Sequence, residues 1–208
     1  MSSQNVSFVI DVEGPLLTFD ETSFGTVIGP QTWSEFTSQL GGGNFALLRD
    51  GREMYAVLRR SFKGNRASEL MALRRKALRQ SEHLRIVQRL LGEAPCVITA
   101  DCDPMALLAA RFHLEPLLPN STIVSSCQHG HRKTMPYFWS VVLHHLAIPP
   151  EDPDRLIVVI TESGDDVEIA AMEEAFRGYQ HRRVRFSPDA ALSIWQELLQ
   201  EFPESAVR

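Results

Sequence analysis

Short apolar runs alternate with longer helical patterns from residue 96 onward, and this alternation constrains the fold of the 208-residue chain more than any other feature. The clearest run, Leu156 to Ile160, consists of aliphatic residues that favour a buried strand. The helical patterns between the runs are about 10–12 residues long, enough for a crossover between parallel strands. Such β-α-β units place helices on both faces of a sheet. The sequence therefore predicts an α/β protein with a Rossmann-like, doubly wound parallel sheet.

Individual elements follow from the apolar runs, capping residues and breakers. Strands are predicted at 6–12, 96–99, 123–124, 156–160 and 184–186, and helices at 103–112, 137–146, 167–177 and 189–202, with another beginning near residue 32. A further helical pattern begins at Ala67, where apolar residues recur every three, four or seven positions, and Gly92 closes it. Residues 125–133 are predicted to form a polar loop.

Length and composition suit one compact domain, with or without an inserted segment. Hydrophobic residues make up 44% of the chain, and the formal net charge of −5 argues against a nucleic-acid binder by overall composition. The first residues lack the basic stretch and apolar run of a signal peptide, and the apolar runs are too short to span a membrane. The cysteines, Cys96, Cys102 and Cys127, form no CxxC pair and are expected to be reduced thiols. These features predict a cytoplasmic protein without membrane attachment.

Residues 49–93 are basic, in contrast to the remainder of the chain. They contain 12 Lys and Arg against 5 Asp and Glu, although the whole chain is acidic. One interpretation is the solvated face of an amphipathic helix. The other is a basic surface that attracts an anionic substrate, a protein partner or a nucleic acid. The sequence leaves both interpretations open.

Polar side chains follow the predicted strands at the points where the strands end. They are Asp11 and Glu13, Thr99, Lys133, and the group Glu162, Asp165 and Asp166. The carboxyl ends of parallel strands meet in one crevice, which is where such sheets bind ligands. Carboxylates can hold Mg²⁺, while a hydroxyl and an ammonium group can hold phosphate oxygens. Because an aspartate can attack phosphorus while a second acid protonates the leaving oxygen, the set is suited to phosphoryl transfer.

The order of these clusters resembles that of the haloacid dehalogenase-like (HAD) phosphohydrolase superfamily. In that family a strand leads into Asp-x-Asp-Gly-Thr, a later strand ends in Thr or Ser, a Lys precedes a helix, and an acidic motif follows a further strand. The corresponding stretches here are Asp11-Val12-Glu13-Gly14-Pro15, Val97-Ile98-Thr99, Lys133-Thr134-Met135-Pro136 and Thr161-Glu162-Ser163-Gly164-Asp165-Asp166. The resemblance implies an HAD-like core of residues 1–15 and 94–208, with residues 16–93 as a mainly helical, C1-type cap insertion.

The resemblance also implies roles for individual residues. Asp11 would be the nucleophile that forms an aspartyl-phosphate, and Glu13 would be the general acid and base. Thr99 and Lys133 would bind the phosphoryl group, with Ala100 beside them in the substrate site. Mg²⁺ would be held by Asp11, Glu13, Glu162 and Asp166, with Asp165 as the alternative in the last motif. The implied activity is Mg²⁺-dependent hydrolysis of a small anionic phosphate ester.

Several positions depart from the family pattern. Glu13 stands in place of the usual second Asp, Pro15 in place of Thr, and Thr161 in place of Gly. Glu162 replaces the first Asp of the last motif. These changes keep open a catalytically inactive HAD-like module that binds or regulates through its basic segment. A dehalogenase is less favoured, because that chemistry needs no metal site and the acids after Ile160 indicate one.

Overall fold

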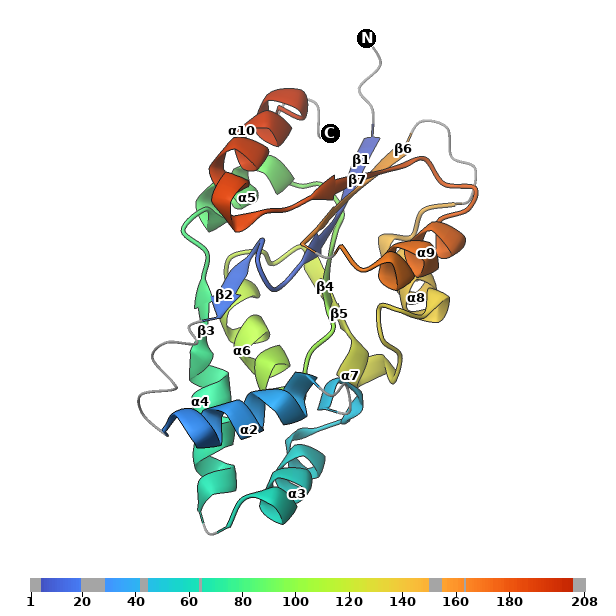
Figure 1. The fold of residues 1–208 in the computed structure, drawn as a ribbon. Coiled ribbons are helices and arrows are strands. Elements are labelled where there is room, and N and C mark those ends of the chain that lie inside the picture. Colours follow the sequence, from blue (N-terminus) through green and yellow to red (C-terminus); the bar gives the residue numbers. More distant parts are fainter. Residues whose placement is uncertain are drawn as a thin grey trace.

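The computed structural model describes residues 5–19, 29–41, 45–63, 65–149, 155–162 and 164–203. Its centre is a sheet of five parallel strands in the order β5-β4-β1-β6-β7 (Figure 1). The strands are β1 (Asn5–Asp11), β4 (Cys96–Ala100), β5 (Ser121–Ser125), β6 (Arg155–Thr161) and β7 (His181–Arg185). Each overlaps a strand predicted from the apolar runs, and β1 lies in the middle of the sheet.

Helices cover both faces of this sheet (Figure 1). One face carries α5 (Leu84–Leu91), α6 (Pro104–Leu114) and α10 (Ala191–Glu201), and the other carries α8 (Pro136–Leu146) and α9 (Asp166–Ala175). Successive residues of a strand point to opposite faces. Phe8 and Ile10 therefore pack with the first group of helices, whereas Val9 packs with the second. This is the doubly wound α/β architecture that the sequence predicts.

A layer of three further helices lies beyond the carboxyl ends of β4 and β5 (Figure 1). It consists of α2 (Pro30–Gly41), α3 (Gly51–Ser61) and α4 (Arg66–Ala77), and we refer to these three helices as the helical layer. Phe36, Met54 and Leu70, one from each helix, are fully buried in an apolar cluster that also contains Met105 of α6. The layer is thus attached to the sheet domain through α6.

The chain enters and leaves the helical layer through a short antiparallel pair. Its strands are β2 (Leu17–Phe19) and β3 (Leu78–Gln80). This pair interrupts the helical pattern predicted from Ala67 to Gly92, because α4 ends where Leu78 becomes extended (φ −81°, ψ 129°) and pairs with β2. The following helix, α5, packs on the sheet with β1 and α10. The range 16–93 assigned to the insertion therefore includes a helix that covers the sheet.

Two shorter segments also differ from the predicted elements. The predicted loop at 125–133 contains a one-turn helix, α7 (Ser126–His129), which ends at Gly130 in the left-handed conformation (φ +69°). The predicted helix at 189–202 begins with a 3₁₀ turn (Pro188–Ala190) before α10. Both differences lie at chain reversals, where apolar periodicity carries little information.

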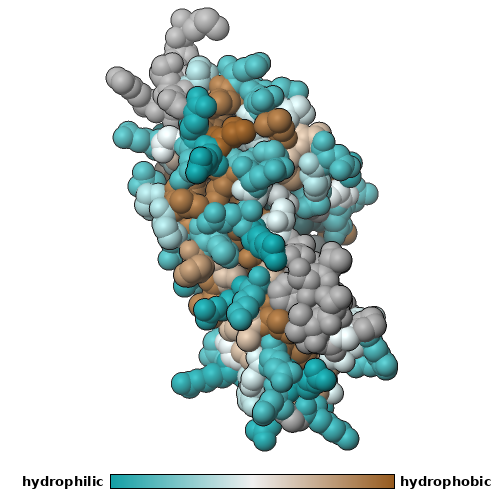
Figure 2. Space-filling model, turned by 90° about the vertical axis from the view of Figure 1, so that its left-hand side faces the viewer, coloured by the Kyte–Doolittle hydropathy of each residue, from teal (hydrophilic) through white to brown (hydrophobic). Residues whose placement is uncertain are grey.

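Hydrophilic side chains cover most of the face seen from the side of α10, α5 and α4, with apolar residues visible between them (Figure 2). Many basic residues of segment 49–93 are exposed, including Arg59 and Arg60 of α3. Arg74 differs from them, because it is buried. None of the helices in the described part of the chain is long and apolar enough to cross a membrane.

Candidate active site

The carboxyl ends of three neighbouring strands bring the predicted polar residues together. β1 lies between β4 and β6, and its last residue, Asp11, is in register with Thr99 of β4. The amide of Val12 donates to the Thr99 carbonyl at 2.9 Å and extends the pairing one residue beyond the strand. Thr161 ends β6 on the other side. Strand register alone therefore places Asp11 between two threonines.

The carboxylate of Asp11 accepts hydrogen bonds on both oxygens. Thr99 Oγ1 and Lys133 Nζ each lie 2.5 Å from Oδ1, and Thr161 Oγ1 lies 2.6 Å from Oδ2. All four residues are buried. These contacts fix the orientation of the carboxylate. The structure thus joins Asp11, Thr99 and Lys133, and it adds Thr161, which sequence comparison identifies only as a departure from the family glycine.

Lys133 reaches Asp11 from the loop that precedes α8. Its backbone carbonyl accepts a hydrogen bond from Nε1 of the buried Trp139 at 2.7 Å, which anchors the loop to the core. The ammonium group also lies 3.9 Å from a carboxylate oxygen of Glu168. Burial acts to lower the pKa of Lys133, but the negative charges of Asp11 and Glu168 outweigh it and raise that pKa above its usual value. The side chain is therefore positively charged at neutral pH.

A tight turn after β1 places Glu13 at the edge of the site, where Glu162, the residue after β6, also lies. Gly14 adopts a positive φ of +87°, and its amide donates to the Leu17 carbonyl at 2.8 Å. This conformation favours glycine, and a β-carbon at position 14 would also force the Glu162 carboxylate to shift. The side chain of Glu13 is 51% exposed. One carboxylate of the turn is therefore open to solvent beside the buried Asp11.

These residues enclose a cavity of about 170 Å³. Its lining includes the residues expected from the sequence, namely Asp11, Glu13, Thr99, Ala100, Lys133 and Glu162. The lining is completed by Val12, Asp101, Cys102 and Glu168. The strand ends therefore form a concave site with the Asp11 carboxylate on its wall.

The start of α9 differs from the predicted arrangement. The Asp165 carboxylate caps the helix by accepting from the Val167 amide at 2.9 Å, and Asp166 is exposed and does not line the cavity. Glu168 lines the cavity instead, with its side chain only 14% exposed. Two positions along a helix correspond to a rotation of about 200°, so residues 166 and 168 face opposite directions. Motif spacing alone does not reveal which of them faces the site.

Negative charge is concentrated in this cavity. Burial and the nearby carboxylates of Asp11 and Glu13 raise the pKa of Glu162 above its usual value. The residues that the structure describes contain no group of three acidic, histidine or cysteine side chains that would hold a metal ion by themselves. Mg²⁺ does not need such a cage, because it commonly binds one or two carboxylates and completes its shell with water and substrate phosphate. Asp11 and Glu162 fit that requirement.

Two contacts outside the predicted motifs border the cavity. Arg132 Nε donates to Asp101 Oδ2 at 3.0 Å. The interaction with the Cys102 thiol lowers the pKa of the Cys127 thiol to about 7, although burial opposes the shift. Both cysteines are free thiols. No spacing rule in the sequence identifies either contact.

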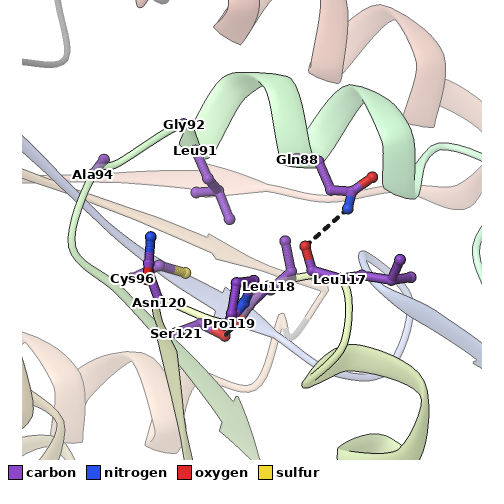
Figure 3. Close-up of a pocket in the computed structure, with 10 residues that line it drawn as sticks. All are labelled: Gln88, Leu91, Gly92, Ala94, Cys96, Leu117, Leu118, Pro119, Asn120 and Ser121. Carbon is purple, nitrogen blue, oxygen red and sulfur yellow. Dashed lines mark hydrogen bonds between the residues drawn. The ribbon is translucent and has the colours of Figure 1, made fainter.

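A separate cavity of about 50 Å³ lies at the amino ends of the strands, between α5 and the start of β5 (Figure 3). Gln88 Nε2 donates to the Leu117 carbonyl at 2.8 Å along one side of it. Burial raises the pKa of Cys96, which lines this cavity, to about 12, so the thiol stays protonated. The carboxylates, the threonine hydroxyl and the lysine described above line the other cavity, at the carboxyl edge of the sheet.

Comparison with known proteins identifies the fold. No family model matches the chain, and no curated protein matches its sequence. A HAD phosphatase from Thermococcus onnurineus is 12% identical with a TM-score of 0.56, covering 98% of this chain and 99% of that one. An L-2-haloacid dehalogenase from Xanthobacter autotrophicus is 15% identical with a TM-score of 0.55, covering 96% and 83%. A HAD-superfamily hydrolase from Ehrlichia chaffeensis is 16% identical with a TM-score of 0.53, covering 96% and 98%. The chain has the HAD-like fold that the order of its motifs implies.

Proposed function

We propose that this chain is a phosphohydrolase that uses Asp11 as its nucleophile. The observation that carries the proposal is the buried Asp11 carboxylate, which lines a cavity and is held by two threonine hydroxyls and a lysine ammonium group. A carboxylate oriented in this way can attack phosphorus and form an acyl phosphate. The HAD-like fold, which phosphatases and dehalogenases share, supports a hydrolase.

Each residue of the site has a role in the proposed reaction. Thr99, Lys133 and the backbone at Ala100 would hold the oxygens of the phosphoryl group, and the charge of the buried Lys133 would stabilise the transition state. In the first step Asp11 attacks phosphorus, and a protonated Glu13 gives its proton to the leaving oxygen. In the second step Glu13 takes a proton from the water that attacks the acyl phosphate. Phosphate leaves, and Asp11 returns to its initial state.

Mg²⁺ suits the carboxylate-rich side of the cavity. Asp11 and Glu162 would supply carboxylate oxygens, and Glu13 would supply its backbone carbonyl. When bound, the ion would offset the negative charge of the carboxylates and of the phosphoryl group. The metal-binding role of Asp166 stays a prediction. Its side chain is exposed and does not line the cavity. Glu168 is the carboxylate of α9 that lines the site.

The substrate is proposed to be a small anionic phosphate ester. A cavity of about 170 Å³ lies below the range of roughly 300–1,000 Å³ that is usual for pockets of drug-sized ligands. The helical layer would act as the cap beside this cavity. Its exposed basic residues would raise the local concentration of a negatively charged molecule.

Two alternative functions are a dehalogenase and an inactive binding module. A dehalogenase would use Asp11 to attack carbon, and structural neighbours named as dehalogenases share this fold. Glu162 and Glu168 favour phosphoryl chemistry, because two further carboxylates in the cavity suit a site that also takes a cation. An inactive module would instead use Asp11 as a structural partner of Lys133 and bind through its basic surface.

Phosphate release tests the proposed function. The purified protein is incubated with aryl phosphates and a panel of small phosphate esters, once with Mg²⁺ and once with a chelator. We expect turnover with Mg²⁺ and its loss on chelation. Halide release from a 2-haloacid without phosphate release would identify a dehalogenase. An absence of both activities, together with an absence of Mg²⁺ binding, would favour the binding module.

A further inference from the structure

A buried arginine of the helical layer contacts the proposed general acid. Arg74 lies in the last turn of α4, and its side chain is only 10% exposed. Its Nη2 atom lies 3.4 Å from Glu13 Oε1, and its Nε atom lies 2.8 Å from Asp103 Oδ2. Glu13 lines the cavity, whereas Arg74 is not among the lining residues of the described chain. Arg74 is therefore placed to influence the reaction through Glu13.

Asp103 is a firm anchor for the guanidinium group. It is the N-cap residue of α6, and its Oδ1 atom accepts from the amides of Met105 at 2.9 Å and Ala106 at 3.1 Å. This arrangement leaves Oδ2 to accept from Arg74. The Asp103 side chain is only 2% exposed, and helix capping fixes its rotamer. The core helix α6 therefore sets the position of an arginine that belongs to the helical layer.

Within the described part of the chain, the side chain of Glu13 has one hydrogen-bond partner, Arg74. Its side chain is half-exposed, and it extends from the turn at Gly14 toward solvent. A free glutamate side chain samples several rotamers, and ordering it costs conformational entropy. The planar guanidinium group can bind two carboxylates in fixed directions, which an ammonium group cannot do as well. Arg74 thus connects a buried carboxylate, Asp103, with a half-exposed one, Glu13.

We propose that Arg74 is a positioning residue that holds Glu13 in the orientation required for proton transfer. This inference rests on the proposed function, which gives Glu13 its role as general acid and base. It also connects the helical layer to the chemistry, because a shift of α4 away from α6 would withdraw the guanidinium group from both carboxylates. Proton transfer would then depend on the docked position of α4.

The test compares aryl phosphates that differ in their need for protonation. Phenyl phosphate releases a basic phenolate and needs a proton donor, whereas 2,4-dinitrophenyl phosphate releases a stable phenolate and does not. We expect Arg74→Gln to lower kcat/KM for phenyl phosphate about 100-fold, which is within the range for loss of a general acid. For the dinitrophenyl ester, we expect kcat/KM to fall less than about 3-fold. Arg75→Gln removes the same charge from the exposed neighbouring position, and its effect should be equal on both esters.

Two further variants separate positioning from folding. Arg74→Gln leaves the buried Asp103 carboxylate without its cation. The double variant Arg74→Gln/Asp103→Asn removes this unpaired charge, and its asparagine keeps the oxygen that caps α6. It should show the same dependence on the leaving group. In a Glu13→Gln background, Arg74→Gln should cause no further loss.

The outcomes that contradict the proposal are distinct from those that contradict the function. An equal loss of kcat/KM for both esters, or an added loss in the Glu13→Gln background, overturns the role of Arg74 and leaves the proposed phosphohydrolase activity unaffected. A wild-type protein that hydrolyses neither ester overturns the proposed function, and the inference falls with it.

Discussion

Replacement of Asp11 by asparagine is expected to lower kcat for phosphate ester hydrolysis by more than about 10³-fold, because it removes the attacking oxygen. The amide keeps one oxygen that can accept from Thr99 or Lys133, and Lys133 retains Glu168 at 3.9 Å. We therefore expect the variant to stay folded. Initial rates measure the first expectation, and circular dichroism with thermal unfolding measures the second.

Asp189→Asn provides the matched control for this substitution. Asp189 is exposed on the 3₁₀ turn before α10, so the same chemical change occurs away from the cavity. We expect its kcat to stay within about 2-fold of the wild-type value, as is usual for surface substitutions. Undiminished turnover in folded Asp11→Asn would show that Asp11 is not the nucleophile.

Lys133→Met is expected to lower both stability and activity. The ammonium group is the charged partner of the buried Asp11 carboxylate, at 2.5 Å. Removal of one member of a buried ion pair leaves an uncompensated charge, which costs about 3–5 kcal/mol in the free energy of unfolding. Loss of the positive charge that stabilises the phosphoryl group should also lower kcat by about 10²–10³-fold, as loss of a preorganised electrostatic contact does elsewhere. Urea unfolding and steady-state kinetics measure the two effects.

The difference in unfolding free energy between the wild type and Lys133→Met should also depend on pH. The pKa of Lys133 is raised in the folded protein, so its contribution to stability is fully present below the unfolded-state pKa of about 10.4 and is lost as the pH rises through the folded-state pKa. The gap between wild type and Lys133→Met should therefore narrow in alkali. Lys76→Met is the control, because Lys76 is exposed at the end of α4, and its stability should match the wild type. An equally stable Lys133→Met would contradict the buried pair.

Most of the sheet could be predicted from the sequence, because β1, β4 and β6 contain short runs of buried apolar residues. Only the end of the mostly basic strand β7 carries that signal. The paired strands β2 and β3 could not be predicted, because their pairing joins Leu17–Phe19 to residues far along the chain. Helical periodicity continues from Ala77 to Leu84 as if no break occurred. Only the contact with β2 ends α4, and only the sheet surface gives α5 its packing partner.

The candidate site was predictable to the extent that residue types at strand ends identify it. Asp11, Thr99 and Lys133 contact one another because strand register and the anchored loop before α8 bring them there. Thr161 and Glu168 were missed, since the first replaces a glycine in the motif and the second depends on the rotation of α9. Arg74 was one of 12 basic residues in its segment, and only burial distinguishes it.

Asp11 becomes phosphorylated during turnover in the proposed reaction. The most direct measurement is to mix the protein with a radiolabelled phosphate ester that it hydrolyses, quench with acid within a turnover, and map the labelled peptide. We expect an acid-stable, alkali-labile label on the peptide that contains Asp11, and none on Asp11→Asn. A label on another residue would contradict the role of Asp11 as the nucleophile.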